Sequence, residues 1–274
     1  LYYNTIGCRN VAVGYNSLLS NTTGSFNTSV GHESLLCNTT GRYNTAIGYH
    51  SSRCNIASQG NTSVGFQSLH YNTTGSYNAA VGMYALHKNT ASSNTAMGYG
   101  ALICNTSTGG NAAFGNSALY YNTASNNTGL GYQAGYSITT GADNTAVGSQ
   151  SLRNSTTGAN NTAVGRCTLY YNSTGSHNTA VGKKALSANT TGNINSAYGA
   201  CTLSSNTTGS NNTALGYNAL VTNTTASNNT GIGVNALCKN TTGSENTSVG
   251  FQSLLGNTTG TQNTATGISA LHNN

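Results

Sequence analysis

The stretch NTAVGRCTLYYNSTGSHNTAVG, residues 161–182, contains the motif NTAVG twice, at Asn161 and again 17 residues later at Asn178. With the first Asn of this motif as position 1, equivalent units recur along the whole chain. They begin at Asn10, Asn27, Asn44, Asn61, Asn78, Asn94, Asn111, Asn127, Asn144, Asn161, Asn178, Asn195, Asn212, Asn229, Asn246 and Asn263. A short fixed period over a whole chain is typical of a solenoid, in which each repeat stacks on the next.

The composition alone suggests a different class, because only 4% of the 274 residues are charged and Pro is absent. Such a chain is often a disordered low-complexity segment. The regular placement of the apolar residues argues against disorder here. Two intervals, 78–94 and 111–127, are one residue shorter, and the missing residue falls in the NTTG linker. This linker is therefore predicted to be the loop of each unit.

Four columns of the repeat predict the fold. Position 5 is Gly and position 1 is Asn in all sixteen units, which indicates a positive φ or a close backbone approach at the Gly. Stacked Asn side chains can form a ladder at about 4.8 Å per coil. Position 4 is apolar except at Thr266, and position 9 is Leu except at Ser52 and Gly135. Both columns are expected to face the interior, against small residues at positions 3 and 8.

Each unit therefore reads as a strand T-A-V, a Gly corner, a second strand x-[AS]-L-x-x and an NTTG turn. Helices are not expected, because Gly, Asn and Thr are poor helix formers. A stack of antiparallel hairpins is a less favoured alternative, since a constant period favours parallel ladders. The predicted fold class is all-β: a parallel β-solenoid (β-roll) of about 16 coils. Residues 1–274 form a single repeat array, and both ends cut a unit in the middle, so we expect a fragment of a longer fibre.

Self-association is expected from the energetics. Two large apolar residues per coil contribute roughly 1.5–3 kcal/mol each when buried, against about 1–2 kcal/mol per residue for ordering the backbone. Columns 6 and 10 carry further Tyr, Phe and Leu residues, and exposed apolar rows of this kind often mark an interface. The alternative is that these Tyr residues are solvated surface groups.

The pattern NTAVGxxALxxNTTGxx resembles the repeats of tail-fibre-like proteins of phages, large DNA viruses and some bacteria. It is similar, more distantly, to the YadA-like heads of trimeric autotransporter adhesins, whose repeat NSxAIG is 14 residues long. The resemblance covers the whole chain and implies a left-handed β-roll in a homotrimer. The 17-residue repeat departs from the autotransporter pattern, so the cross-section of the coil is expected to differ.

The function predicted from repeat and resemblance is a structural fibre or adhesin shaft, extracellular at a cell or virion surface. It would act as a rigid spacer or as a polyvalent surface for surface glycans or host receptors, with copies of itself as the first partner. An ice-binding β-solenoid is the alternative, because Thr columns at positions 2, 13 and 14 give regular hydroxyl rows. A tail-spike enzyme would require a groove with paired carboxylates.

No catalytic, cofactor or metal site is predicted. The three acids, Glu33, Asp143 and Glu245, lie in separate units and do not suggest an acid/base pair. His70 and His87 occupy position 10 of adjacent coils without an expected carboxylate, and are interpreted as surface residues rather than metal ligands. The formal charge of +6 is scattered, so nucleic acid is not an expected partner. No apolar run approaches the roughly 18 residues that span a membrane.

Two kinds of covalent site remain. Cys37 and Cys54 both occupy position 11 of consecutive coils, so their Cα atoms are expected about 4.8 Å apart, which makes a disulfide a candidate. N-glycosylation is a candidate at NTTG-type sequons, because exposed turns can hold a glycan; the alternative is that these Asn residues serve the turn or a ladder. The candidate sites are Asn21, Asn38, Asn72, Asn105, Asn172, Asn189, Asn206, Asn223, Asn240 and Asn257.

Overall fold

The computed structural model describes residues 1–274 as two compact units, Leu1–Gln133 and Ala134–Asn274. Both units are all-β and contain no helix. Unit 1 contains β1 (Val11–Val13), β2 (Thr28–Val30), β3 (Thr45–Ile47), β4 (Thr62–Val64), β5 (Ala79–Val81), β6 (Thr95–Met97), β7 (Ala112–Phe114) and β8 (Thr128–Leu130). Unit 2 contains β9 (Thr145–Val147), β10 (Thr162–Val164), β11 (Thr179–Val181), β12 (Ser196–Tyr198), β13 (Thr213–Leu215), β14 (Thr230–Ile232), β15 (Thr247–Val249) and β16 (Thr264–Thr266).

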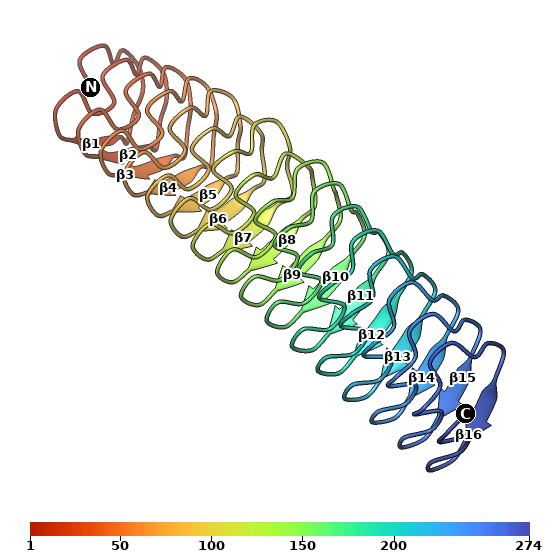
Figure 1. The fold of residues 1–274 in the computed structure, drawn as a ribbon. Helices are drawn as coiled ribbons and strands as arrows, with labels where there is room; N and C mark the ends of the chain where they lie inside the picture. The colour runs from red at the N-terminus through yellow and green to blue at the C-terminus, as the bar shows by residue number, and fades with distance from the viewer. The chain divides into compact units, whose positions relative to one another are not determined.

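Within each unit the strands lie side by side in chain order, and every pair is parallel (Figure 1). The register follows the repeat: Thr162 pairs with Thr179, and Val164 pairs with Val181. Residues one repeat apart therefore stack on each other. The predicted parallel β-solenoid with a 17-residue repeat is confirmed, and the antiparallel alternative is wrong.

Glycine at position 5 is required by the stacking. Gly182 has a φ of +131°, and a Cβ placed on it would lie 2.5 Å from the carbonyl oxygen of Gly199 on the next coil. Real Cβ atoms do not approach backbone that closely, and a φ in this region is strained for any other residue. The invariant column thus results from both a positive φ and a close backbone approach.

The predicted second strand is wrong, because positions 6 to 11 form a series of turns. In the coil that begins at Asn161, Cys167 and Leu169 adopt left-handed φ values of 55° and 48°. A left-handed residue costs roughly 1–2 kcal/mol, but main-chain bonds to both neighbouring coils offset this cost. The amide of Cys167 donates to Ser149 O at 3.1 Å, and that of Leu169 donates to Ala185 O at 3.0 Å. The chain keeps ladder bonding without strand geometry.

The interior contains one large side chain per coil, not two, and none in the coil of Ser52. Leu152 and Leu169 are fully buried in the core of unit 2 with Ala163, so the expectation that position 9 faces the interior is confirmed. The expectation that position 4 faces inward is wrong. Alternation within a three-residue strand directs position 3 inward and position 4 outward, and Val13 and Leu215 are 56% and 48% exposed. The single fibre-like array, its handedness and its oligomeric state stay predictions.

Candidate functional site

The ten asparagines predicted as glycosylation sites are buried, with at most 1% of each residue exposed. They occupy position 12 and form a ladder. In unit 2, Asn206 Nδ2 donates to Asn189 Oδ1 and to Gly209 O, both at 2.9 Å, and Asn206 Oδ1 accepts from Asn223 Nδ2 at 2.8 Å. The premise that these asparagines lie exposed in turns is wrong. Glycosylation of these asparagines stays a prediction. The folded chain disfavours it, because the amide nitrogen to be modified has no solvent access.

A second ladder lies at position 1, as predicted. The Oδ1 atom of Asn178 accepts the main-chain N–H of Asn195 at 2.9 Å. The Nδ2 group of Asn178 donates at 2.9 Å to Gly192 O, at the far end of the same coil. Each asparagine thus closes its own coil and ties it to the next one. Buried amides need such partners, so both asparagine columns serve the architecture.

The cysteine pair lies on neighbouring coils, as expected from the repeat. Cys37 N donates to Arg53 O at 3.0 Å, immediately before Cys54. Both thiols are free, so the candidate disulfide is not formed. Residues stacked in register have parallel Cα–Cβ bonds, which keeps their Cβ atoms near the coil spacing of about 4.8 Å; a disulfide requires about 3.5–4.5 Å. Burial raises the pKa of the Cys37 thiol, and the neighbouring Cys54 raises it further.

Four histidines form a row across consecutive coils of unit 1. The ring centroids of His32 and His50 are 5.7 Å apart, those of His50 and His70 5.5 Å, and those of His70 and His87 5.3 Å. His70 and His87 were expected to be surface residues. His70 is instead buried, and its Nδ1 lies 3.2 Å from His50 O, as His87 Nδ1 lies 3.1 Å from Gln67 O.

This environment favours neutral imidazoles. Burial lowers the pKa of His70 to about 4, and the neighbouring His87 and His50 lower it as well. Burial also lowers the pKa of His87. It lowers the pKa of His50 too, although the Glu33 carboxylate acts in the opposite direction. Burial disfavours a positive charge on these three rings, so the folded state favours the uncharged forms of His50, His70 and His87 at neutral pH.

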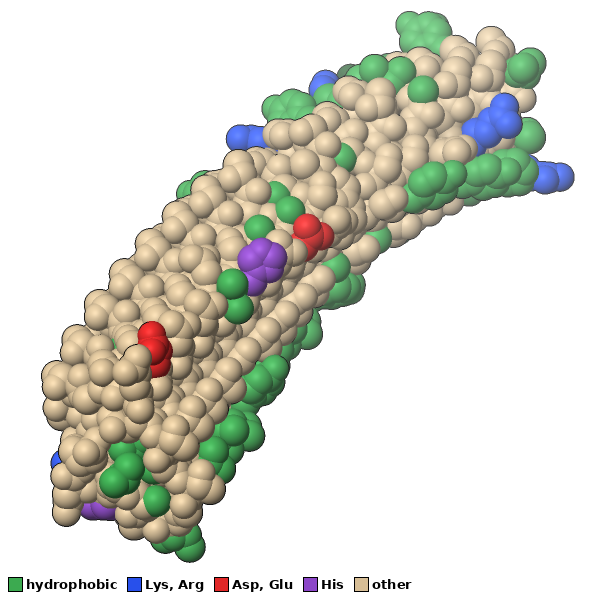
Figure 2. All heavy atoms as spheres, turned by 90° about the vertical axis from the view of Figure 1, so that its right-hand side faces the viewer, with side chains coloured by type: hydrophobic (Ala, Val, Ile, Leu, Met, Phe, Trp, Pro, Cys, Tyr) green, Lys and Arg blue, Asp and Glu red, His purple; other side chains and the backbone are tan.

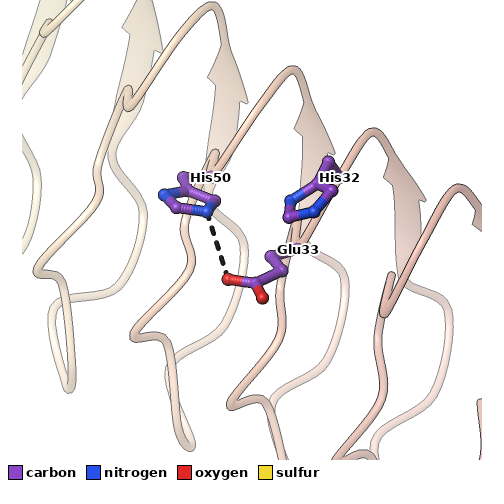
Figure 3. A group of neighbouring side chains, drawn as sticks. All are labelled: His32, Glu33 and His50. Atoms are coloured by element: carbon purple, nitrogen blue, oxygen red, sulfur yellow. Dashed lines mark ion pairs between the residues drawn. The ribbon is translucent and has the colours of Figure 1, made fainter.

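At one end of the row, Glu33 lies between two imidazoles (Figure 3). Its Oε2 is 3.1 Å from His50 Nε2 and 2.8 Å from Arg53 Nε. The hydrogen bond from Arg53 lowers the pKa of Glu33. One ligand atom from each of His32, Glu33 and His50 lies within 4.8 Å of the other two. Two imidazoles and a carboxylate are a ligand set for borderline divalent metals such as Zn²⁺.

Sequence reasoning missed this cluster, although a signal was present. Glu33 and His50 both occupy position 7, so the period places one directly beside the other. His32 precedes Glu33 in the chain at position 6. A comparison of the titratable residues at position 7 would have indicated that Glu33 lies beside His50 and next to His32. The prediction from the sequence instead treated Glu33 as an isolated acid.

The outward face of the strands carries an apolar surface, which we call the apolar stripe and define as the apolar residues at positions 4 and 6 of the coils. Position 6 also contains polar residues, among them His32, Arg166 and Lys183. Figure 2 shows apolar side chains gathered in rows on a surface with few charged groups. Position 4 bears no charge in any coil. Members of the stripe that are at least 38% exposed are Val13, Tyr15, Ile47, Tyr49, Phe66, Met83, Met97, Tyr99, Leu130 and Tyr132 in unit 1, and Tyr198, Leu215, Tyr217, Val234, Phe251 and Ile268 in unit 2.

Unit 2 also contains an open pocket of about 300 Å³. Its lining includes Cys167, Lys184 and two tyrosines, Tyr170 and Tyr171, but no carboxylate. A pair of carboxylates for acid/base chemistry is therefore missing from its wall. The structure contains no helix long and apolar enough to cross a membrane.

No family model, curated protein or solved structure matches the chain at a significant level. The resemblance to tail-fibre and trimeric autotransporter repeats, and the absence of enzymatic activity, stay predictions.

Proposed function

We propose that this chain is a structural fibre or adhesin shaft at a cell or virion surface, in which three copies pack side by side through the apolar stripe. The observation that carries the proposal is the outward direction of position 4. An apolar residue recurs there in fifteen of sixteen coils, yet the core does not use it. A column kept apolar on the outside is what a lateral interface requires.

The area available is sufficient for a stable contact. Ten stripe residues of unit 1 are at least 38% exposed. At about half exposure, side chains of this size offer together on the order of 800 Å², since an aromatic side chain buries 150–250 Å² in full. A standard interface buries about 800 Å² per partner. A second copy of the same chain is the favoured partner, because it presents the same apolar stripe at the same coil spacing, and position 4 is uncharged in every coil. The number three and the surface location rest on the resemblance.

The proposal is tested by the mass of the full chain in solution. Sedimentation equilibrium should give three times the chain mass of 27.9 kDa. The double variant Met97→Lys/Leu130→Lys, on exposed ends of β6 and β8, should dissociate to monomers, because six lysines would face the interface. The matched control Thr40→Lys/Thr74→Lys changes exposed turn residues and should leave the assembly intact. A monomeric wild type, or an assembly unaffected by the stripe variant, would show that the stripe is not an interface.

Ice binding is a second candidate, supported by the Thr column at position 2. Thr162 and Thr179 are paired in register on the outward face, so their hydroxyls repeat at about 4.8 Å. The position-13 column is less suited, because Thr190 Oγ1 donates to Thr207 O at 3.0 Å and Thr207 Oγ1 to Thr224 O at 3.1 Å. Thermal hysteresis that is lost when Thr162 and Thr179 become Lys would favour this function. Absence of hysteresis in the wild type removes it.

A further inference from the structure

We propose that His32, Glu33 and His50 bind a divalent transition metal of the Zn²⁺ type and clip two neighbouring coils of unit 1 together. His32 and Glu33 belong to the coil that begins at Asn27, and His50 to the coil that begins at Asn44. The three ligand atoms already lie within 4.8 Å of one another. Zinc bonds of about 2.0–2.2 Å place neighbouring ligands about 3.4 Å apart, so small side-chain rotations complete the site.

The local geometry supports coordination rather than a plain ion pair. Both Arg53 and His50 contact Glu33 through Oε2, and Oε1 accepts no hydrogen bond from the protein. Arg53 thereby fixes the carboxylate in the way that outer-shell partners orient metal ligands. His32 is held between Tyr15 and Tyr49, with ring centroids 5.1 Å and 5.2 Å away. His32 is exposed on the single chain, so a metal ion has access to the site from solvent.

The coil of His50 also departs from the repeat around the site. Position 9 is Ser52 instead of the Leu that most other coils have. Ser52 Oγ lies 2.8 Å from Ser63 Oγ within the core. The column 7 residues of other coils include no second acid. The site is therefore a local departure from the repeat and not a consequence of it.

Zn²⁺ titration of the full chain, followed through the histidine ring signals by NMR, tests the proposal. The signals of His32 and His50 should shift together and saturate, while that of His177, in unit 2, stays in place. The Glu33→Gln variant should bind at least about tenfold more weakly, since even the loss of an outer-shell partner costs 10–100-fold in metal affinity. Zinc bound at cysteines would leave the histidine signals unchanged and would count against the site.

The repeat itself provides conservative variants. Gln already occupies position 7 at Gln67, with a φ of 52° against 53° for Glu33 and 54° for His50, so Glu33→Gln and His50→Gln are compatible with the backbone. Glu245→Gln removes an acid from another column and should keep wild-type affinity. The proposal is overturned if millimolar Zn²⁺ moves neither His32 nor His50, or if Glu33→Gln binds as tightly as the wild type.

Discussion

Two stretches of the repeat, residues 27–93 in unit 1 and residues 161–262 in unit 2, share one backbone but differ in their outer columns. Both keep Asn at position 1 and Gly at position 5. The first stretch carries a row of four histidines with Glu33 and Arg53, whereas the second contains a single histidine, His177. Position 12 is Asn throughout both stretches, from Asn38 to Asn89 and from Asn172 to Asn257.

The difference separates what the coil requires from what it tolerates. The columns that never change either form a ladder or allow the backbones to approach closely. The columns that change, positions 6, 7, 10 and 11, lie on turns whose main-chain bonds do not depend on the side chain. Functional side chains can therefore occur in one coil without changing the backbone of the next coil, as the histidine row shows.

The largest effect is expected at position 5, and it should be equal in the two stretches. Gly48→Ala and Gly182→Ala each place a Cβ against backbone, 2.7 Å from Gly65 O and 2.5 Å from Gly199 O. Neither neighbour can move without shifting its own coil, so we expect losses of about 4 kcal/mol or more in the free energy of unfolding. Urea titration of the full chain measures them.

A glycine at position 7 provides the control. Gly100 has a φ of +61°, and its nearest obstacle is the ring of Tyr120. Asn occupies the same column at Asn16 with a φ of 53°, so Gly100→Asn should change stability by less than about 1 kcal/mol. A similar loss at positions 5 and 7 would contradict the distinction between required and tolerated columns.

The features predicted from the sequence are those that repeat. The period defined the parallel register, the position-1 ladder and the positive φ at position 5, because each depends on what stacks above and below. The outward direction of position 4 was not predicted, because the size of its side chains was given more weight than the alternation of inward and outward side chains along a strand. With Ala163 inward, Val164 must face outward. The variation of this column, to Tyr198 and Thr266, was a signal of exposure.

The turns and the histidine cluster were harder to predict for a physical reason. A buried Leu in left-handed conformation, such as Leu169, opposes its local preference, and only the ladder bonds of both neighbouring coils compensate. The same bonds bury Asn206 in a segment whose composition resembles an exposed turn. The site at Glu33 depends on residues of two coils, which single-motif searches do not combine.

An intermediate effect is expected from acid, and only in the first stretch. The pKa of His70 falls from 6.5 to about 4 on folding because of burial, so the unfolded chain binds a proton first. Stability is complete above pH 6.5 and decreases as the pH falls toward 4. Between pH 7 and pH 5 the loss due to His70 is about 2 kcal/mol. The hydrogen bond from Arg53 lowers the pKa of Glu33, so its contribution to stability is lost at lower pH than that of His70.

His70→Leu should remove that part of the pH dependence, since Leu occupies position 10 at Leu36 and Leu255. The control His177→Asn changes an exposed position 17, where Asn160 and Asn211 already occur, and should keep the full dependence. Hydrogen exchange should localise the acid effect to residues 61–93 and spare 178–211. Equal acid sensitivity of the two segments would contradict the assignment to the histidine row.

The smallest effect is expected where unit 2 interrupts its own ladder. Position 12 is Ser155 instead of Asn, and its buried Oγ has no hydrogen-bond partner. In Ser155→Asn, Nδ2 should donate to Gly158 O, as Asn172 Nδ2 does to Gly175 O at 2.8 Å, and Oδ1 should accept from Asn172. One or two new buried hydrogen bonds predict a gain of about 1 kcal/mol in the free energy of unfolding. The control Ser155→Ala measures the effect of removing the unpartnered hydroxyl alone. If the free energy of unfolding increases equally in both variants, the ladder hydrogen bonds contribute nothing at this position, and the coil requires only a side chain of suitable size.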